Sequence, residues 1–356
     1  MRIAQVAPPF QPIPPALYGD TERVVATLCE ELVRRGHDVT LFAAAESRTS
    51  ARLISTMPQA VWHYDPRLND FSPFWAMTLD SVWQHADEFD LIHSHLDYWG
   101  YALARHTPVP VLTTLHGRLD APQWQPLYRH FNDVPLVSIS DAQRQPLPWA
   151  NFMATVYHGI DLEEFTFSSE SGGYLAFLGR ASPEKGLDAA IHVAREAGVP
   201  LKVAARLPQQ HIHQPGGRAD WEYFEQVLQP LLQQEQVEFV GEIAGRDKDA
   251  FLGSAVALLF PICWPEPFGL VMVEALACGT PVLALNHGSV PEIIEDGVTG
   301  FVRDAEEDLV EAVHRIGTLQ RAACRTAAEQ RFSPGAMAAS YMRVYETLLG
   351  NRQGRT

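Results

Sequence analysis

The stretch FPICWPEPFGLVMVEALACGT, residues 260–280, runs from an apolar segment through a loop into a helical pattern. Two prolines bracket Glu266 and keep it out of a helix, because proline restricts both its own φ and the residue before it. From Phe268 onward apolar residues recur at helical spacing, and Gly279 follows the last of them. The stretch therefore predicts a loop with one carboxylate and a helix that carries a second, Glu274.

The start of this helix is a candidate binding site. The first amides, those of Phe268, Gly269 and Leu270, lack partners within the helix and are suited to bind hydroxyls and anionic oxygens. Glu274 comes eight residues after Glu266, about 12 Å along the axis at 1.5 Å per residue. A fitting ligand has hydroxyl groups at both ends and negative charge in the middle, and a nucleotide-sugar has this shape.

Length and charge exclude several classes of function. The 356 residues suffice for two domains with sizeable cores. The 27 basic and 43 acidic residues give a formal net charge of −16, which argues against a nucleic-acid partner. No basic amphipathic helix is evident, and Pro261 interrupts the apolar run 255–264, so stable membrane insertion is not expected.

The cysteine pattern indicates a reducing compartment. The four cysteines are scattered without a Cys-x-x-Cys pair, namely Cys29, Cys263, Cys278 and Cys324. Prolines interrupt the N-terminal apolar run MRIAQVAPP, which does not fit a signal peptide. We therefore expect a soluble cytoplasmic enzyme.

Strand and helix patterns alternate along the chain, which predicts two doubly wound α/β halves. Strands are expected in the first half near residues 2–7, 38–44, 91–95, 110–117, 135–140 and 154–160. Strands are expected in the second half near residues 174–180, 201–205, 237–241, 256–261 and 281–285. The polar segment ESGG, residues 170–173, resembles a linker, so the expected domains are 1–169 and 170–333, with a final helical segment, 334–356.

Several motifs resemble one family, in the same order and at fitting distances. They are EPFGLVMVE (266–274), SVPEIIEDGVTGF (289–301), FLGRASPEKG (177–186) and TLHGR (114–118). They are similar to the motifs of retaining family 4 glycosyltransferases, whose Glu-x7-Glu pair matches Glu266 and Glu274, and the likeness covers nearly the whole chain. It implies the GT-B fold, in which two Rossmann-like domains face each other across a cleft and the final helix crosses back to the first domain.

The resemblance also implies a reaction, the transfer of a hexosyl group from a nucleotide-sugar, in particular a UDP-sugar, to a hydroxyl acceptor. Neither a metal ion nor another cofactor is required in this reading. Glu266 and the amides of Phe268, Gly269 and Leu270 would hold the donor sugar, and Glu274 would bind the ribose hydroxyls. His116 would contact the donor sugar near the reacting carbon.

Two cations suit the diphosphate. Arg180 and Lys185 follow a predicted strand end, where a planar guanidinium and an ammonium can bind the phosphates. By resemblance they neutralise the leaving diphosphate, a backbone amide at Ile243 reads the base, and the loop at Gly19 approaches the phosphates. His95, Asp97 and Tyr98 are candidates for the acceptor side.

The sequence departs from the family at Asp20, where a second glycine is usual. Asp20 either caps the helix predicted at 21–35, with its carboxylate on a backbone amide, or indicates a changed leaving group. Two alternatives therefore stay open: a phosphorylase on the same fold that uses inorganic phosphate, and a non-catalytic sugar- or nucleotide-binding protein.

The remaining polar motifs do not predict a metal site. His93 and His95 alternate on one strand and face the same side, but no further ligands are evident. Asp247-Lys248-Asp249 spells an Asp-x-Asp motif, yet it opens a predicted helix, where acidic residues suit the dipole. Aromatic residues that could stack on an acceptor in the first half are Trp62, Tyr64, Trp75, Trp124 and Tyr128.

Overall fold

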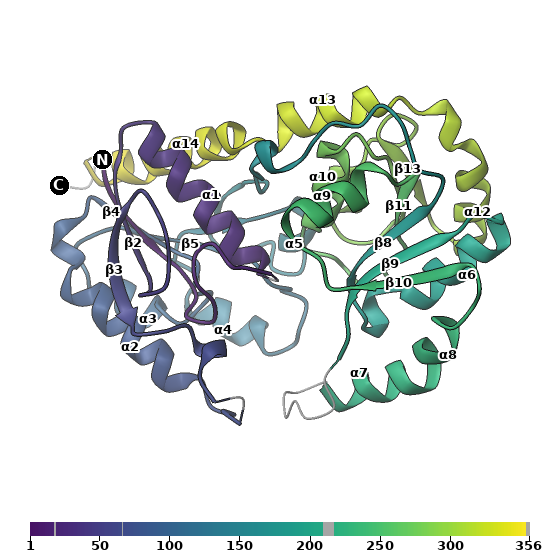
Figure 1. Ribbon diagram of the computed structural model, residues 1–356. Helices are drawn as coiled ribbons and strands as arrows, with labels where there is room; N and C mark the ends of the chain where they lie inside the picture. The colour runs from purple at the N-terminus through teal and green to yellow at the C-terminus, as the bar shows by residue number, and fades with distance from the viewer. Residues whose placement is uncertain (18, 66, 209–216, 354–356) are drawn as a thin grey trace. The chain divides into compact units, whose positions relative to one another are not determined.

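The computed structural model describes residues 1–17, 19–65, 67–208 and 217–353 (Figure 1). It divides into two compact units, the first made of Met1–Ile160 with Pro334–Thr356 and the second of Asp161–Ser333. The division lies at Asp161 and not at residue 170. The segment before residue 170 is bound to the second unit, since the Thr166 N–H donates to Asp249 at 2.7 Å and the Ser168 N–H donates to the Cys278 carbonyl at 3.0 Å.

The first unit is built on a seven-stranded parallel sheet with the order β3-β2-β1-β4-β5-β6-β7. Its strands are β1 (Arg2–Val6), β2 (Asp38–Ala44), β3 (Arg52–Met57), β4 (Leu91–Ser94), β5 (Val111–Thr114), β6 (Leu136–Ser138) and β7 (Phe152–Thr155). Its helices are α1 (Asp20–Arg34), α2 (Ser72–Gln84), α3 (Tyr101–Ala104), α4 (Trp124–His130), α5 (Asp141–Arg144) and α14 (Pro334–Gln353). The final helix, α14, thus packs in the first unit, against α1 (Figure 1).

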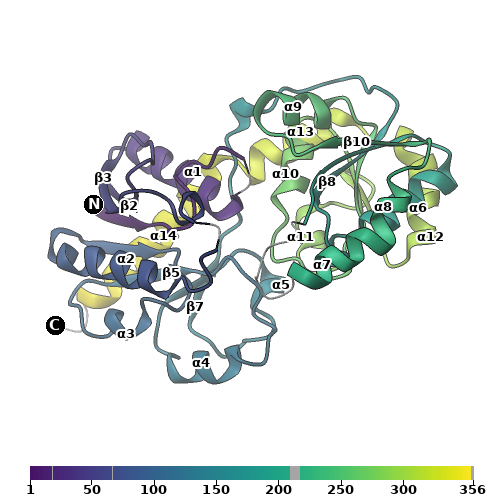
Figure 2. The ribbon, with the colours of Figure 1, turned by 60° about the horizontal axis from the view of Figure 1, so that its bottom comes forward.

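The second unit repeats this plan with a six-stranded parallel sheet of order β10-β9-β8-β11-β12-β13. Its strands are β8 (Leu175–Arg180), β9 (Leu201–Arg206), β10 (Val237–Gly241), β11 (Ala257–Phe260), β12 (Val282–Leu285) and β13 (Gly300–Arg303). Its helices are α6 (Leu187–Ala197), α7 (Gly217–Tyr223), α8 (Gln229–Leu231), α9 (Gly245–Gly253), α10 (Leu270–Ala277), α11 (Val290–Ile293), α12 (Glu306–Arg315) and α13 (Arg321–Arg331). Helices α6 and α12 pack together on one face of the sheet, and α10 and α13 pack together on the other (Figure 2).

Each sheet has one point where the strand order reverses, between β1 and β4 in the first unit and between β8 and β11 in the second. Ligands of open α/β sheets bind outside the carboxyl ends of the strands at such a point. His95 follows β4, Arg180 ends β8, and the Glu266 loop follows β11. The sequence motifs therefore cluster at these two edges.

The structure corrects one prediction about the start of α1. Gly19 is the N-cap of this helix, with φ 148°, and Asp20 is its first residue, so Asp20 does not cap it. A Cβ at Gly19 would lie 2.8 Å from both Gln11 Nε2 and Pro15 Cγ, which leaves room only for glycine. Asp20 instead adds negative charge to the first turn, where the helix dipole favours it.

None of the helices in the described ranges is both long and apolar enough to cross a membrane.

Candidate functional site

The Glu266 loop of the second unit is held in place by the loop that follows β12. The Ser289 N–H donates to the Glu266 carbonyl at 2.9 Å, and the Ser289 hydroxyl donates to the Phe268 carbonyl at 2.9 Å. Gly288, with φ 58°, lies so close that a Cβ there would come within 2.3 Å of the backbone nitrogen and oxygen of Glu266. Glycine is required at this contact, and the carboxylate is thereby placed on a fixed backbone.

The Glu266 carboxylate receives two hydrogen bonds. Lys185 Nζ lies 2.6 Å and Trp264 Nε1 lies 2.9 Å from the same oxygen, Oε2. The Lys185 ammonium also lies 4.7 Å from the centroid of the Trp264 ring. Both of these hydrogen bonds fall on Oε2.

The turn after β8 brings Lys185 to this carboxylate. Pro183–Lys185 forms a 3₁₀ turn, and Gly186 follows it with φ 69° as the N-cap of α6. A Cβ at Gly186 would lie 2.0 Å from the Pro261 carbonyl oxygen, so the turn after β8 touches the loop after β11 directly. The left-handed glycine separates this turn from α6.

Arg180 pairs with a carboxylate of the same turn. Its Nη2 lies 2.7 Å from Glu184 Oε1, which also accepts a hydrogen bond from the Ser182 hydroxyl at 2.8 Å. Burial opposes ionisation of Glu184, but these donors and the nearby cations hold its pKa below the ordinary value. The guanidinium is thus held at the end of β8 by an anion that a diphosphate could replace.

The helix that carries Glu274 begins at Leu270 and not at Phe268. Gly269 is its N-cap with φ 79°, a left-handed conformation that ends the preceding loop. Phe268 is buried and packs edge-on against Phe332, so its side chain anchors the loop. Of the predicted sugar-binding amides, those of Phe268 and Gly269 therefore precede α10, and that of Leu270 is the first amide of the helix.

Glu274 has a partner that the sequence analysis did not assign. Lys248 Nζ on α9 lies 2.5 Å from Glu274 Oε1, and both side chains are about nine-tenths buried. This ion pair joins α9 to α10, and Ile243 lies in the segment just before α9. The scarcity of lysine was the one available signal, since Lys185, Lys202 and Lys248 are the only lysines in the chain.

In the first unit, His116 ends a chain of buried hydrogen bonds. Gln5 Nε2 donates to the Tyr345 hydroxyl at 3.1 Å, and Gln5 Oε1 lies 3.0 Å from His95 Nε2. His95 Nδ1 in turn lies 2.9 Å from His116 Nε2. The chain connects the final helix, α14, to the loop after β5.

These contacts determine which ring nitrogens carry protons. Burial lowers the pKa of both His95 and His116, the latter to about 3, so both rings are neutral at pH 7. An amide oxygen only accepts, so His95 Nε2 donates to Gln5 Oε1, and His95 Nδ1 must accept a hydrogen bond from His116 Nε2. His116 Nδ1 is then a bare acceptor; it is buried and has no hydrogen-bond partner among the residues that the structure describes. It can accept a hydrogen bond from a hydroxyl group.

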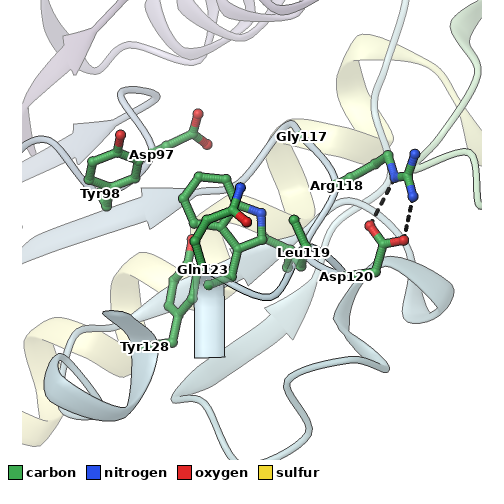
Figure 3. A pocket seen from close by; sticks show the side chains of 10 residues that line it. Asp97, Tyr98, Gly117, Arg118, Leu119, Asp120, Gln123 and Tyr128 are labelled. Atoms are coloured by element: carbon green, nitrogen blue, oxygen red, sulfur yellow. Dashed lines mark hydrogen bonds and ion pairs between the residues drawn. The ribbon is translucent and has the colours of Figure 1, made fainter. Parts of the chain in front are cut away.

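A pocket of about 430 Å³ in the same unit is lined in part by Gly117, the residue after His116 (Figure 3). Asp97 lies in its wall, with φ 49°, and its carboxylate accepts a hydrogen bond from the backbone N–H of His116. Burial raises the pKa of Asp97 to about 6. Tyr98, Trp124 and Tyr128 also line the pocket, so two of the predicted acceptor-side residues lie together in it.

The other predicted residues have different surroundings. His95 is fully enclosed in the hydrogen-bond chain and does not line the pocket. Trp75 is buried and stacked on Trp99, 5.3 Å away, whereas Trp62 is exposed. Among the described residues no group of three or more histidine, cysteine, aspartate or glutamate side chains is arranged to hold a metal ion.

Glu22 is a buried acid that the sequence analysis did not single out. It lies in the first turn of α1, and burial raises its pKa to about 7. Its position three residues after Gly19 places an ionisable group at the loop edge where β1 and β4 meet. The sequence gives no sign that Glu22 is buried, because glutamate is common in the first turn of a helix.

Two family models match consecutive parts of the chain. The model described as Glycosyltransferase Family 4 matches residues 21–164. The model described as Glycosyl transferases group 1 matches residues 162–331. Between them they include both histidines of the hydrogen-bond chain and both motif glutamates.

Relatives and solved structures match over nearly the full length. The phosphatidyl-myo-inositol mannosyltransferase of Mycobacterium leprae is 24% identical over 98% of this chain and 97% of its own. Sucrose-phosphate synthase from Thermosynechococcus elongatus superposes with a TM-score of 0.77 at 20% identity, over 98% of this chain and 99% of that chain. The Anabaena protein HepE, solved with UDP and glucose, superposes with a TM-score of 0.70 at 18% identity, over 96% and 98%. The two structures share the fold of this chain.

Proposed function

Because the chain belongs to the family 4 glycosyltransferases of GT-B fold, we propose that it moves a hexosyl group from a UDP-sugar to a hydroxyl acceptor. We propose further that the anomeric configuration is retained and that no metal ion takes part. The Lys185–Glu266 pair, at the strand-order reversal of the second unit, carries this proposal. It puts a cation for phosphate and a carboxylate for sugar hydroxyls side by side.

The proposed donor site follows from charge. Arg180 and Lys185 bind the diphosphate and stabilise the negative charge that grows on it as the sugar leaves. In the structure each cation rests on a carboxylate, Glu184 or Glu266, which keeps it in place without a ligand. Two side-chain cations of this kind supply the charge that a divalent ion supplies in other phosphate sites.

Glu266 and Glu274 take the two ends of the donor. Glu266 Oε1 accepts a hydrogen bond from a hydroxyl of the sugar, and Glu274 accepts from the ribose. The segment before α9 reads the base through the amide of Ile243, and the Gly19 loop allows a close backbone approach to the phosphates. Since His116 Nδ1 is an acceptor, His116 takes a hydrogen bond from a donor-sugar hydroxyl.

Uridine is the proposed base. The Anabaena protein with the same fold was solved with UDP and glucose. The position of Asp20 in the first turn of α1 gives it a structural role in this proposal, and the leaving group is then a diphosphate and not inorganic phosphate.

Calorimetric titration with UDP, GDP, ADP and inorganic phosphate, each with and without EDTA, tests the proposal. We expect UDP to bind selectively and EDTA to leave its affinity unchanged. Glu274→Gln should weaken UDP binding by about 10- to 100-fold, the equivalent of one hydrogen bond to a charged group. Glu238→Gln, which removes the exposed partner of Lys202 in the same unit, is the matched control and should bind UDP as the parent does.

Two results would reject the donor assignment. One is the absence of binding to any nucleotide, with phosphate binding instead, which supports a phosphorylase. The other is UDP binding without turnover of any UDP-hexose, which supports a binding protein. NMR of the product anomer tests retention separately, because an inverted product contradicts only that part of the proposal.

A further inference from the structure

None of the residues assigned to the donor lines the pocket that includes Gly117. It is lined by the loop after β4, the loop after β5 and the start of α4, all in the first unit. Two of its lining residues adjoin His116. Gly117 is the next residue in the chain, and Asp97 accepts a hydrogen bond from the His116 N–H. A molecule in this pocket therefore lies next to the place where the donor sugar is proposed to contact His116.

The negative side chains of the pocket outnumber the positive one. Its charged side chains are Asp97, Arg118 and Asp120. Arg118 is bound to Asp120 through both Nε, at 2.8 Å, and Nη2, and Figure 3 shows the guanidinium turned toward that carboxylate. Arg118 is thus neutralised within the pocket, while Asp97 adds negative charge on the side nearest His116. A phosphate or carboxylate group on the ligand would be repelled by Asp97 and would find Arg118 already occupied.

The rest of the wall suits the apolar face of a sugar ring. Tyr98 and Trp124 lie with their ring centroids 5.5 Å apart at an angle of 49°, and the buried Tyr128 lines the same pocket. Aromatic rings combine apolar area with a polar edge. A sugar ring has C–H groups that pack on an aromatic ring and O–H groups that donate to a carboxylate, and this pocket offers both.

We propose that this pocket holds the acceptor and selects an uncharged polyhydroxy ring, a saccharide or cyclitol, over its phosphorylated form. The proposal rests on the proposed function, since an acceptor exists only for a transferase. Asp97 accepts a hydrogen bond from a ring hydroxyl, Trp124 packs against the ring, and the Arg118–Asp120 pair limits anion binding.

Saturation-transfer NMR with UDP-saturated protein tests this inference, with methyl α-D-glucopyranoside and glucose 6-phosphate as matched probes. We expect the parent protein to transfer saturation to the neutral glycoside and to bind the phosphate weakly. Asp120→Asn removes the carboxylate that binds Arg118 in the pocket and should raise the affinity for glucose 6-phosphate about tenfold, equivalent to about 1.4 kcal/mol. Trp124→Ala should reduce binding of both probes.

A matched control is available in the same unit. Asp65 pairs with Arg67 in the same two-residue spacing as Arg118 and Asp120, but outside the pocket. Asp65→Asn should leave the affinities for both probes as in the parent. Equal effects of Asp65→Asn and Asp120→Asn would reject the role of Arg118 as a masked anion site.

The failure of this inference is distinguishable from failure of the proposed function. UDP affinity and acceptor-free hydrolysis of UDP-glucose are measured on the same samples, and neither needs the pocket. If UDP does not bind and UDP-glucose is not hydrolysed, the proposed function is rejected. If both persist while neither probe binds, or glucose 6-phosphate binds the parent as well as the glycoside does, the acceptor assignment alone is rejected.

Discussion

Lys248 Nζ lies 2.5 Å from Glu274 Oε1, and Lys185 Nζ lies 2.6 Å from Glu266 Oε2. Two of the three lysines in the chain are therefore bound to the two glutamates of the Glu-x7-Glu motif. Each pair is largely buried, so each carboxylate has a counter-ion in a setting where an unpaired charge would be costly. The two glutamates of the motif therefore act together with Lys185 and Lys248.

Loss of Lys248 should destabilise the second unit. Lys248→Met leaves the Glu274 carboxylate buried without its counter-ion, which costs about 3–5 kcal/mol for such pairs. The double variant Lys248→Met, Glu274→Leu removes both charges and should recover most of this loss. Urea unfolding of the three proteins measures it, with Lys202→Met as the control, since the exposed Lys202–Glu238 pair is worth at most about 1 kcal/mol. If Lys248→Met and Lys202→Met lower the free energy of unfolding equally, the Lys248–Glu274 pair does not stabilise the second unit as proposed.

Lys185 should act chiefly on the rate of transfer. Lys185→Met removes a charge aimed at the growing negative charge of the diphosphate, so kcat should fall about 10²- to 10³-fold. The affinity for UDP should change less, because Arg180 still contacts the phosphates. Initial rates and UDP calorimetry on one preparation separate the two effects, and full activity of Lys185→Met would refute the assignment.

Gly186 and Gly198 form a matched pair at the two ends of α6. They have φ 69° and 68°, so alanine is strained by about 1–2 kcal/mol at either position. Only at Gly186 does a Cβ meet another atom, the Pro261 carbonyl oxygen at 2.0 Å. Gly186→Ala should thus cost more stability than Gly198→Ala and should weaken UDP binding, because the Lys185 turn must move away from Glu266. Calorimetry and urea unfolding of both variants test this, and equal effects would show that the close contact is unimportant.

The direction of the hydrogen-bond chain to His116 is testable by ¹⁵N NMR of the histidine rings. In the parent we expect His116 Nε2 to carry the proton and Nδ1 to be bare. Gln5→Leu removes the oxygen that fixes His95, so His116 should become a mixture of tautomers while the fold persists. Activity should then fall through kcat more than through the affinity for UDP. A parent spectrum with the proton on His116 Nδ1 would overturn the assignment.

Stability should depend on pH through His93 in a defined direction. Burial lowers the pKa of His93 to about 3, with a smaller effect of His116, so the unfolded chain binds more protons between pH 6.5 and 3. The stability contributed by neutral His93 is complete above pH 6.5 and is lost as the pH falls toward 3, at about 1.4 kcal/mol per pH unit. His93→Gln cannot titrate, so its free energy of unfolding should decline less steeply in acid.

Glu22 should have the opposite effect, which makes it a control for this measurement. Burial raises its pKa from 4.5 to about 7, so its contribution to stability is complete below pH 4.5 and is lost as the pH rises through 7. Glu22→Gln should accordingly decline more steeply than the parent between pH 7 and 4.5. Parallel curves for the parent and both variants would contradict both pKa shifts.

Much of the fold followed from local pattern. The apolar stripe of α1 and the short apolar runs of β1, β2 and β8 were predicted because strand and helix periods are set by neighbouring residues. Several elements were not predicted, among them β3, α2, β13, α12 and α13. Two of them have weak patterns, since β3 is an edge strand with exposed positions and α2 mixes apolar and polar residues around its circumference.

Glycines account for the errors at the ends of helices. The helix start predicted at Phe268 was wrong because Gly269 adopts a left-handed conformation. Asp20 was predicted as a cap, but Gly19 takes the cap position. The sequence does not show that Gln11 and Pro15 lie close to Gly19. A glycine conformation depends on distant packing, which periodicity does not record.

The sequence by itself determined the two α/β halves, the family, and the identity of Glu266, Glu274, Arg180 and Lys185 as candidates, because these follow from spacing along the chain. Only the tertiary structure decided which of them meet. Lys185 lies 81 residues from Glu266, Lys248 lies 26 from Glu274, and Gln5 lies 90 from His95. Such contacts depend on strand order, because parallel strands bring the loops at their carboxyl ends together whatever their separation in the chain.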